Sequence, residues 1–142
     1  MHSSEKVIVP YSKKQVFDLV MDVPSYKHFL TYCTDSFQVE ENHDFIIAKM
    51  VFRKGLISIS VTSKNTFYGH DKITMQQIDG TFTQLYGEWN FEFLEHNKTQ
   101  IYFLLQVELP PISTMFGGAL FVGQLRTEFV RSFVKRAYQV YG

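Results

Sequence analysis

Two long alternating segments followed by one long amphipathic segment limit the folds open to this chain more than any other feature. Residues 81–93 and 99–109 alternate apolar and polar side chains, which is the period of a β-strand. Residues 119–141 place apolar side chains at steps of three and four, which predicts a helix. Strands of about 11 residues would reach about 37 Å, and the helix about 34 Å. Because these lengths match, we expect a long antiparallel sheet that curls along a single terminal helix.

The earlier segments complete an expected order of one strand, two short helices, six strands and the long helix. Residues 5–10 predict the first strand. Ser12 with Gln15 three residues later is the pattern of a capping box, which predicts the start of a short helix. Pro24 suits the first turn of a second short helix, which we expect to end near Tyr32. These two helices are expected to plug one open end of the curled sheet.

Two glycines are expected to end or bend the predicted strands. The dipeptide Asp79-Gly80 is typical of a two-residue hairpin turn. Gly87 falls where the alternation loosens, as expected at a bulge or bend. The alternation of the late strands directs one set of side chains to the inside of the curl: Trp89, Phe91, Phe93, Ile101, Phe103 and Leu105.

Length and composition exclude several classes of protein. The chain has 142 residues, which fits one domain spanning residues 1–142. Lys plus Arg equals Asp plus Glu at 14 each, so DNA binding is not expected. The single Cys cannot form an internal disulfide. No signal-peptide pattern opens the chain, and its longest apolar run is far shorter than the ~20 residues that span a bilayer. We therefore expect a cytoplasmic protein.

No arrangement of titratable residues indicates catalysis or metal binding. Three of the five His lie in separate predicted turns, so no metal-ligand spacing is present. Cys33 has no base beside it in the sequence and is expected to be a small buried hydrophobe. Glu88, Glu92 and Glu108 alternate away from the inward face. We therefore expect a protein that is not an enzyme, with no catalytic residues, no metal and no required cofactor.

Six segments, in this order along nearly the whole chain, resemble one known family: Val9–Ser12, Phe17–Tyr26, Phe29–Cys33, Lys54–Asn65, Ile78–Phe91 and Phe133–Tyr141. The chain resembles the START-like, helix-grip superfamily. Within it, the chain is similar to the group that includes the ribosome association toxin RatA and the mitochondrial coenzyme Q-binding protein. The resemblance implies an α+β helix-grip fold. In that fold a curved antiparallel sheet of about seven strands surrounds a long C-terminal helix, with two short helices after the first strand.

The resemblance implies functions of three classes. The favoured one is non-catalytic binding of a polyprenylated quinone, most of all ubiquinone, in the cavity of the grip, in support of respiratory electron transport. The alternative is binding of the large ribosomal subunit, which blocks its joining to the small subunit. A polyketide cyclase-like enzyme is the least favoured class, because the sequence offers no carboxylate pair for acid–base work. A bacterial cytoplasmic location is also implied, with peripheral contact at the inner membrane as a further hypothesis.

The residues expected to contact a quinone or another hydrophobic small molecule are Tyr26, Phe29, Trp89, Phe91, Phe103, Leu105, Val122, Arg126, Phe129 and Phe133. Arg126 interrupts the apolar stripe of the terminal helix, at a position where relatives tend to carry a small residue. A buried, unpaired Arg is costly. Arg126 is therefore expected either to extend to solvent at the cavity mouth or to bind a ligand head group.

Two further features of the C-terminal region leave alternatives open. Arg131, Lys135 and Arg136 are either a solvated face or, under the ribosomal alternative, a contact with ribosomal RNA. Residues 114–124 contain paired glycines, which destabilise a helix. This segment is either a kinked helix start or an apolar lip that opens the cavity or touches a membrane.

Overall fold

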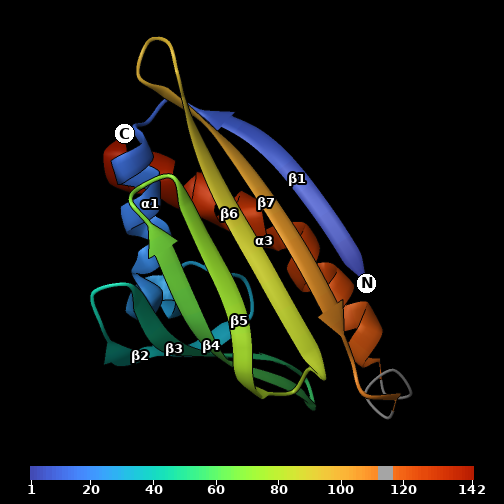
Figure 1. Ribbon diagram of the computed structural model, residues 1–142. Coiled ribbons are helices and arrows are strands. Elements are labelled where there is room, and N and C mark those ends of the chain that lie inside the picture. Colours follow the sequence, from blue (N-terminus) through green and yellow to red (C-terminus); the bar gives the residue numbers. More distant parts are fainter. Residues whose placement is uncertain (112–116) are drawn as a thin grey trace.

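Seven strands form one antiparallel sheet in the computed structural model, which describes residues 1–111 and 117–142 (Figure 1). The strands lie in the order β1-β7-β6-β5-β4-β3-β2, so β1 and β2 form the two edges. Their bounds are β1 (His2–Val9), β2 (Cys33–Glu41), β3 (Phe45–Lys54), β4 (Ile57–Tyr68), β5 (Lys72–Gly80), β6 (Gln84–Leu94) and β7 (Lys98–Glu108).

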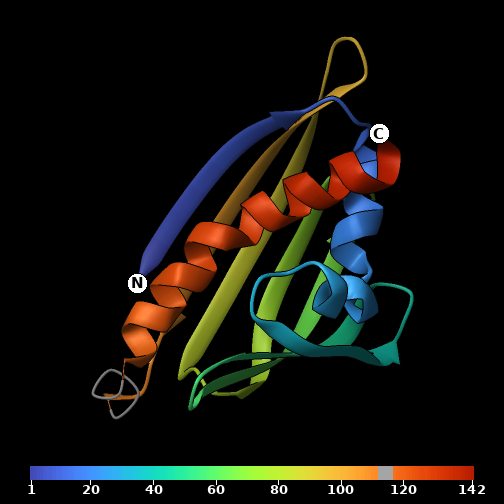
Figure 2. The same cartoon turned by 180° about the vertical axis from the view of Figure 1, so that it is seen from behind.

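The long helix α3 (Gly118–Tyr141) crosses the concave side of this sheet (Figure 2). It has 24 residues and is therefore about 36 Å long. This length is close to that of the 11-residue strands β6 and β7. The order of elements and the α+β helix-grip architecture are both confirmed.

Two short helical elements follow β1 and lie near the C-terminal end of α3 (Figure 2). The first, α1 (Lys13–Met21), begins with the predicted capping box. The Ser12 hydroxyl oxygen accepts from the Gln15 N–H at 3.2 Å, and the Gln15 side chain accepts from the Ser12 N–H at 2.9 Å. Tyr141 of α3 donates a hydrogen bond to the Gln15 carbonyl at 2.9 Å, which joins the helix start to the chain end.

The second short element is a 3-10 helix, η1 (Val23–His28), and it ends earlier than expected. The sequence predicted a helix as far as Tyr32, but Tyr32 has φ +65°, in the left-handed region. A non-glycine residue in this region does not continue a right-handed helix. The turn instead leads directly into β2, and the Cys33 N–H donates to the Leu30 carbonyl at 3.0 Å.

The predicted hairpin joins β5 and β6, but its turn does not lie at Asp79-Gly80. Strand β5 continues through Gly80, which pairs with Val61 of β4 after a register shift between Thr62 and Ser63. The connection to β6 comes later, and there the Gln77 side chain donates to the Phe82 carbonyl at 2.7 Å. The positive φ of Gly80, +146°, serves this irregular pairing and not a two-residue turn.

Two expectations for β6 also need correction. The sequence predicted a bulge or a bend at Gly87. The pairing with β7 runs without a shift from Gln84 to Leu94, so there is no bulge there, and the bend stays a prediction. Phe93 is 60% exposed although it shares the phase of the buried Trp89. The reason is that the pairing with β5 ends at Asn90, and Phe93 lies beyond it near the β6–β7 turn.

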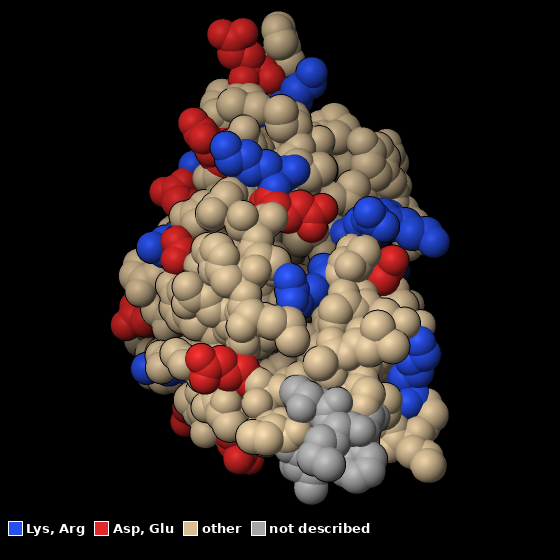
Figure 3. Space-filling model, turned by 90° about the vertical axis from the view of Figure 1, so that its right-hand side faces the viewer, with Lys and Arg blue, Asp and Glu red and all other residues tan. Residues whose placement is uncertain are grey.

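Charged groups of both signs are interspersed on the face shown in Figure 3, as expected for a chain with 14 of each. Within residues 1–111 and 117–142, no helix combines the length and the apolar character needed to cross a membrane.

Candidate ligand-binding site

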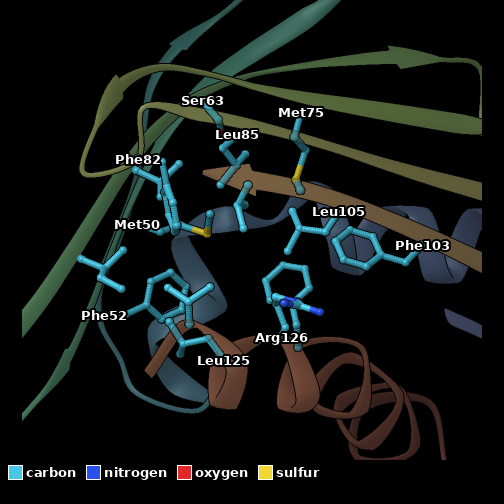
Figure 4. Close-up of a pocket in the computed structure, with 15 residues that line it drawn as sticks. Met50, Phe52, Ser63, Met75, Phe82, Leu85, Phe103, Leu105, Leu125 and Arg126 are labelled. Carbon is cyan, nitrogen blue, oxygen red and sulfur yellow. The ribbon is translucent and has the colours of Figure 1, made fainter. Parts of the chain in front are cut away.

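A cavity lies between the sheet and the N-terminal half of α3 (Figure 4). Its walls come from five consecutive strands, β3 to β7, and from one side of α3. Thirteen of its fifteen lining residues are apolar, among them Met50, Phe52, Met75, Leu105 and Leu125. The site is therefore suited to hydrocarbon.

Among the described residues that line this cavity, only Ser63 and Arg126 have polar side chains. Ser63 is buried, and its hydroxyl donates to the Asn65 side-chain oxygen at 2.8 Å. Arg126 is half-buried and extends toward β1, where its Nε donates to the Ser3 hydroxyl oxygen at 3.2 Å. Arg126 therefore supplies the positive charge at the rim of an otherwise apolar space.

The free volume of the cavity is about 60 Å³. Sites for drug-sized ligands occupy roughly 300–1,000 Å³, so a quinone with its tail requires the walls to move. The walls contain Met50 and Met75, whose unbranched side chains adapt readily to a changed shape. The Met75 methyl group fits against Gly87 because Gly87 has no side chain. A Cβ atom at residue 87 would lie 2.6 Å from the Met75 methyl carbon.

A cluster of aromatic rings lies beside the cavity. Trp89 is fully buried, and its ring centroid is 4.5 Å from Phe103 and 5.9 Å from Phe129, which both line the cavity. On its other sides it contacts Phe91 and Phe133. The Trp89 Nε1–H has no hydrogen-bond partner among the described residues.

The residues predicted to contact a ligand fall into two groups. Those that line the cavity are Phe103, Leu105, Val122, Arg126 and Phe129. The others lie outside its lining: Trp89, Phe91, Phe133, Tyr26 and Phe29.

Tyr26 and Phe29 belong to the segment that was expected to plug the grip. Their ring centroids lie 5.1 and 5.2 Å from that of Phe133 on α3. Tyr26 is buried, its hydroxyl donates to the Val20 carbonyl, and burial raises the pKa of this phenol. These rings thus pack the C-terminal half of α3, while the cavity lies along its N-terminal half.

The sequence did not single out most of the cavity wall. Met50 and Phe52 come from β3, Met75 from β5, and Phe82 and Leu85 from the start of β6 and the turn before it. Ile59 and Val61 also line the cavity, and residues 57–62 alternate apolar and polar side chains in the sequence. This alternation could not show which opposite element these side chains would meet.

The basic residues of α3 do not share one face. Arg131 and Lys135 are exposed and lie one helical turn apart, and Arg131 is 3.9 Å from Glu128. Arg136 is half-buried, with its guanidinium 5.3 Å from the centroid of the Phe29 ring. Arg126 points to β1 and the cavity rim, so it adds no charge to the Arg131–Lys135 face.

Titratable side chains in the described parts of the chain form no metal-binding cluster, and burial or hydrogen bonding shifts the pKa of Cys33 and Glu88. No cluster of three or more His, Cys, Asp or Glu side chains that could hold a metal occurs in residues 1–111 and 117–142. Burial raises the pKa of the Cys33 thiol to about 11, which makes it a poor nucleophile. Glu88 accepts hydrogen bonds from Asn90 and Tyr86, and these bonds hold the pKa of its carboxyl below the usual value.

The predicted lip at residues 114–124 is described only in part. Residues 114–116 lie outside the described residues, and α3 begins at Gly118 after Gly117, which has φ +82°.

Comparisons with known proteins agree with this architecture. The chain matches the family model "Polyketide cyclase / dehydrase and lipid transport" over residues 9–134. It is 32% identical over 142 residues to the ribosome association toxin RatA of Pseudomonas aeruginosa, covering 99% of this chain and 98% of that protein. It is 34% identical over 140 residues to RatA of Escherichia coli, covering 97% and 87%.

A solved START superfamily protein from Mycobacterium smegmatis superposes with a TM-score of 0.80. The two share 15% sequence identity, and 98% of each chain is covered, so this likeness concerns the fold. The family model covers most of the chain and two relatives exceed 30% identity over nearly all of it, so this chain belongs to the polyketide cyclase/dehydrase and lipid transport family.

Proposed function

We propose that this protein associates with the ribosome and does so without catalysis, as a cytoplasmic protein. The observation that carries the proposal is its similarity, over nearly the whole chain, to proteins named ribosome association toxins. In its finer form, the protein binds the large subunit and blocks its joining to the small subunit. The exposed pair Arg131 and Lys135 supplies a surface suited to the phosphates of ribosomal RNA.

Reversing both charges, as Arg131→Glu with Lys135→Glu, is expected to weaken binding to the large subunit by about tenfold or more. Each lost phosphate contact also lowers the dependence of binding on salt. The measurement is co-sedimentation with purified large subunits over a series of salt concentrations.

The matched control reverses two exposed lysines elsewhere, as Lys6→Glu with Lys98→Glu, and changes the net charge by the same amount. It should bind like the parent. If both double variants lose affinity equally, this face of α3 is not the contact. If the parent itself fails to co-sediment at low salt, ribosome association is wrong for this protein.

A second function is supported by the cavity, which is apolar and carries one charged group at its rim. It is non-catalytic binding of a hydrophobic small molecule, with ubiquinone the favoured ligand. The family description, which includes lipid transport, agrees with such a ligand. Mass spectrometry of organic extracts from the purified protein shows directly whether a quinone accompanies it.

Leu105→Trp is expected to fill the cavity and abolish binding of decyl-ubiquinone, because Leu105 lies on its wall. Leu104→Trp is the matched control, since Leu104 is the preceding residue of β7 and points to the opposite face of the sheet. Titration calorimetry measures both affinities, and circular dichroism verifies the folds. Equal affinities in the two variants would exclude the cavity as the quinone site.

A further inference from the structure

The charge of Arg126 has no ionic partner in the described parts of the chain. No carboxylate there forms a salt bridge with it, whereas Arg131 on the same helix lies near Glu128. Its hydrogen bonds go to two neutral acceptors, the Ser3 hydroxyl oxygen at 3.2 Å and the Met1 sulfur at 2.9 Å. Sulfur is a weak acceptor, so much of the binding capacity of this guanidinium is unused.

Arg126 lies where its positive charge is next to an apolar surface. Figure 4 shows its side chain on the α3 side of the cavity, across from Leu105 and Phe103 of the sheet. Its stem lines the cavity while its guanidinium reaches the hydroxyl of Ser3 on β1. A molecule held here would therefore have a polar end at β1 and an apolar part between α3 and the sheet.

We propose that the cavity binds a monocarboxylic acid with an aliphatic chain, of the fatty-acid class, through its ionised carboxylate at Arg126. This inference rests on the second proposed function, that the cavity is a ligand site. The planar guanidinium donates to both oxygens of a carboxylate at once, and such charge-assisted pairs are stronger than bonds to neutral acceptors. The Ser3 hydroxyl, which accepts from Arg126 here, can turn to donate to the same carboxylate.

The charge balance favours a carboxylate over a phosphate ester. Arg126 is the single charged residue in the described part of the lining, so one negative charge neutralises it. A phosphate monoester carries about −1.5 to −2 at neutral pH and would leave charge unpaired beside an apolar wall. The free volume of about 60 Å³ is too small for a ten-carbon chain, so binding requires Met50 or Met75 to move and enlarge the cavity.

The test compares decanoate with its uncharged methyl ester, methyl decanoate, by titration calorimetry at neutral pH. The parent protein is expected to bind decanoate about tenfold or more tightly than the ester, because only the acid forms the charge-assisted bonds. Arg126→Gln should remove this preference and lower the affinity for decanoate by a similar factor. Arg53→Gln, an exposed change on β3 outside both proposed sites, should bind decanoate like the parent.

The outcomes separate this inference from the function on which it rests. If the parent binds acid and ester equally, or Arg126→Gln binds decanoate as tightly as the parent, the carboxylate assignment is overturned. The cavity function still stands in that case if Leu105→Trp abolishes the binding. If the parent binds neither decanoate, its ester nor decyl-ubiquinone, both fail together. The comparison of acid and ester needs only the parent, so it decides the matter even if Arg126→Gln does not fold.

Discussion

Replacing Trp89 with alanine is expected to lower the free energy of unfolding by about 3–5 kcal/mol. Trp89 is 0% exposed, and its ring contacts four others, on Phe91, Phe103, Phe129 and Phe133. These rings connect β6 and β7 to α3, so the substitution would leave a void where the sheet meets the helix. Urea denaturation followed by far-ultraviolet circular dichroism measures the loss.

Two further variants separate packing from polarity at this site. Trp89→Phe keeps an aromatic ring and removes the Nε1–H, which has no partner among the described residues. A buried donor without a partner costs about 1–3 kcal/mol, so this change should be far milder than alanine. Phe93→Ala on the same strand is the control, because Phe93 is 60% exposed and its loss should change stability by less than about 1 kcal/mol. A similar loss for Trp89→Ala and Phe93→Ala would contradict the central role of this cluster.

Replacing Gly80 with alanine is expected to destabilise the protein by about 3 kcal/mol. Its φ of +146° lies where residues with a side chain are strained. A Cβ at this position would also overlap the Ser60 carbonyl oxygen and lie 3.1 Å from the Val61 Cα, and both are backbone atoms. That carbonyl accepts from the Thr81 N–H at 2.9 Å, so the clash falls on a bonded part of the sheet.

Gly123→Ala provides a control of opposite sign. Gly123 lies within α3, and a Cβ there would have no heavy atom within 4 Å. Because Ala favours a helix over Gly by about 1 kcal/mol, this variant should be more stable than the parent. The two glycine variants are compared by urea denaturation. Equal stability of Gly80→Ala and the parent would mean that β4 and β5 pair differently near residue 80.

The fold was predictable because its signals are local and repeated. The alternation of apolar side chains in β6 and β7, and their stripe along α3, indicate which side of each element is buried. The capping box at Ser12 indicates by itself where a helix begins. The long helix and the long strands also have matching lengths, and few folds bury the apolar side of the helix and the apolar side of the sheet together. The order of strands and helices therefore followed from the sequence.

Predictions of local structure were wrong where a tertiary contact outweighed the local preference of the sequence. Asp79-Gly80 has the composition of a tight turn, yet Gly80 pairs with Val61 because β5 continues beside β4. The helix expected to reach Tyr32 ends at His28, because the chain must turn into β2, and Tyr32 lies in that turn. Phe93 has the phase of a core residue but extends beyond the strand that would cover it.

Periodicity in the chain is enough to predict the layers of this protein and the inward sides of its late strands and terminal helix. The position of the cavity depends on the folded structure. Side chains from five strands, β3 to β7, and from α3 surround it, and the sequence does not show how these elements pack together. The folded structure likewise separated Arg126, at the rim beside Ser3, from the exposed Lys135 on the same helix. The periodicity of a strand or helix shows which of its sides is buried. The curl of the sheet determines which side chains of other elements contact that side.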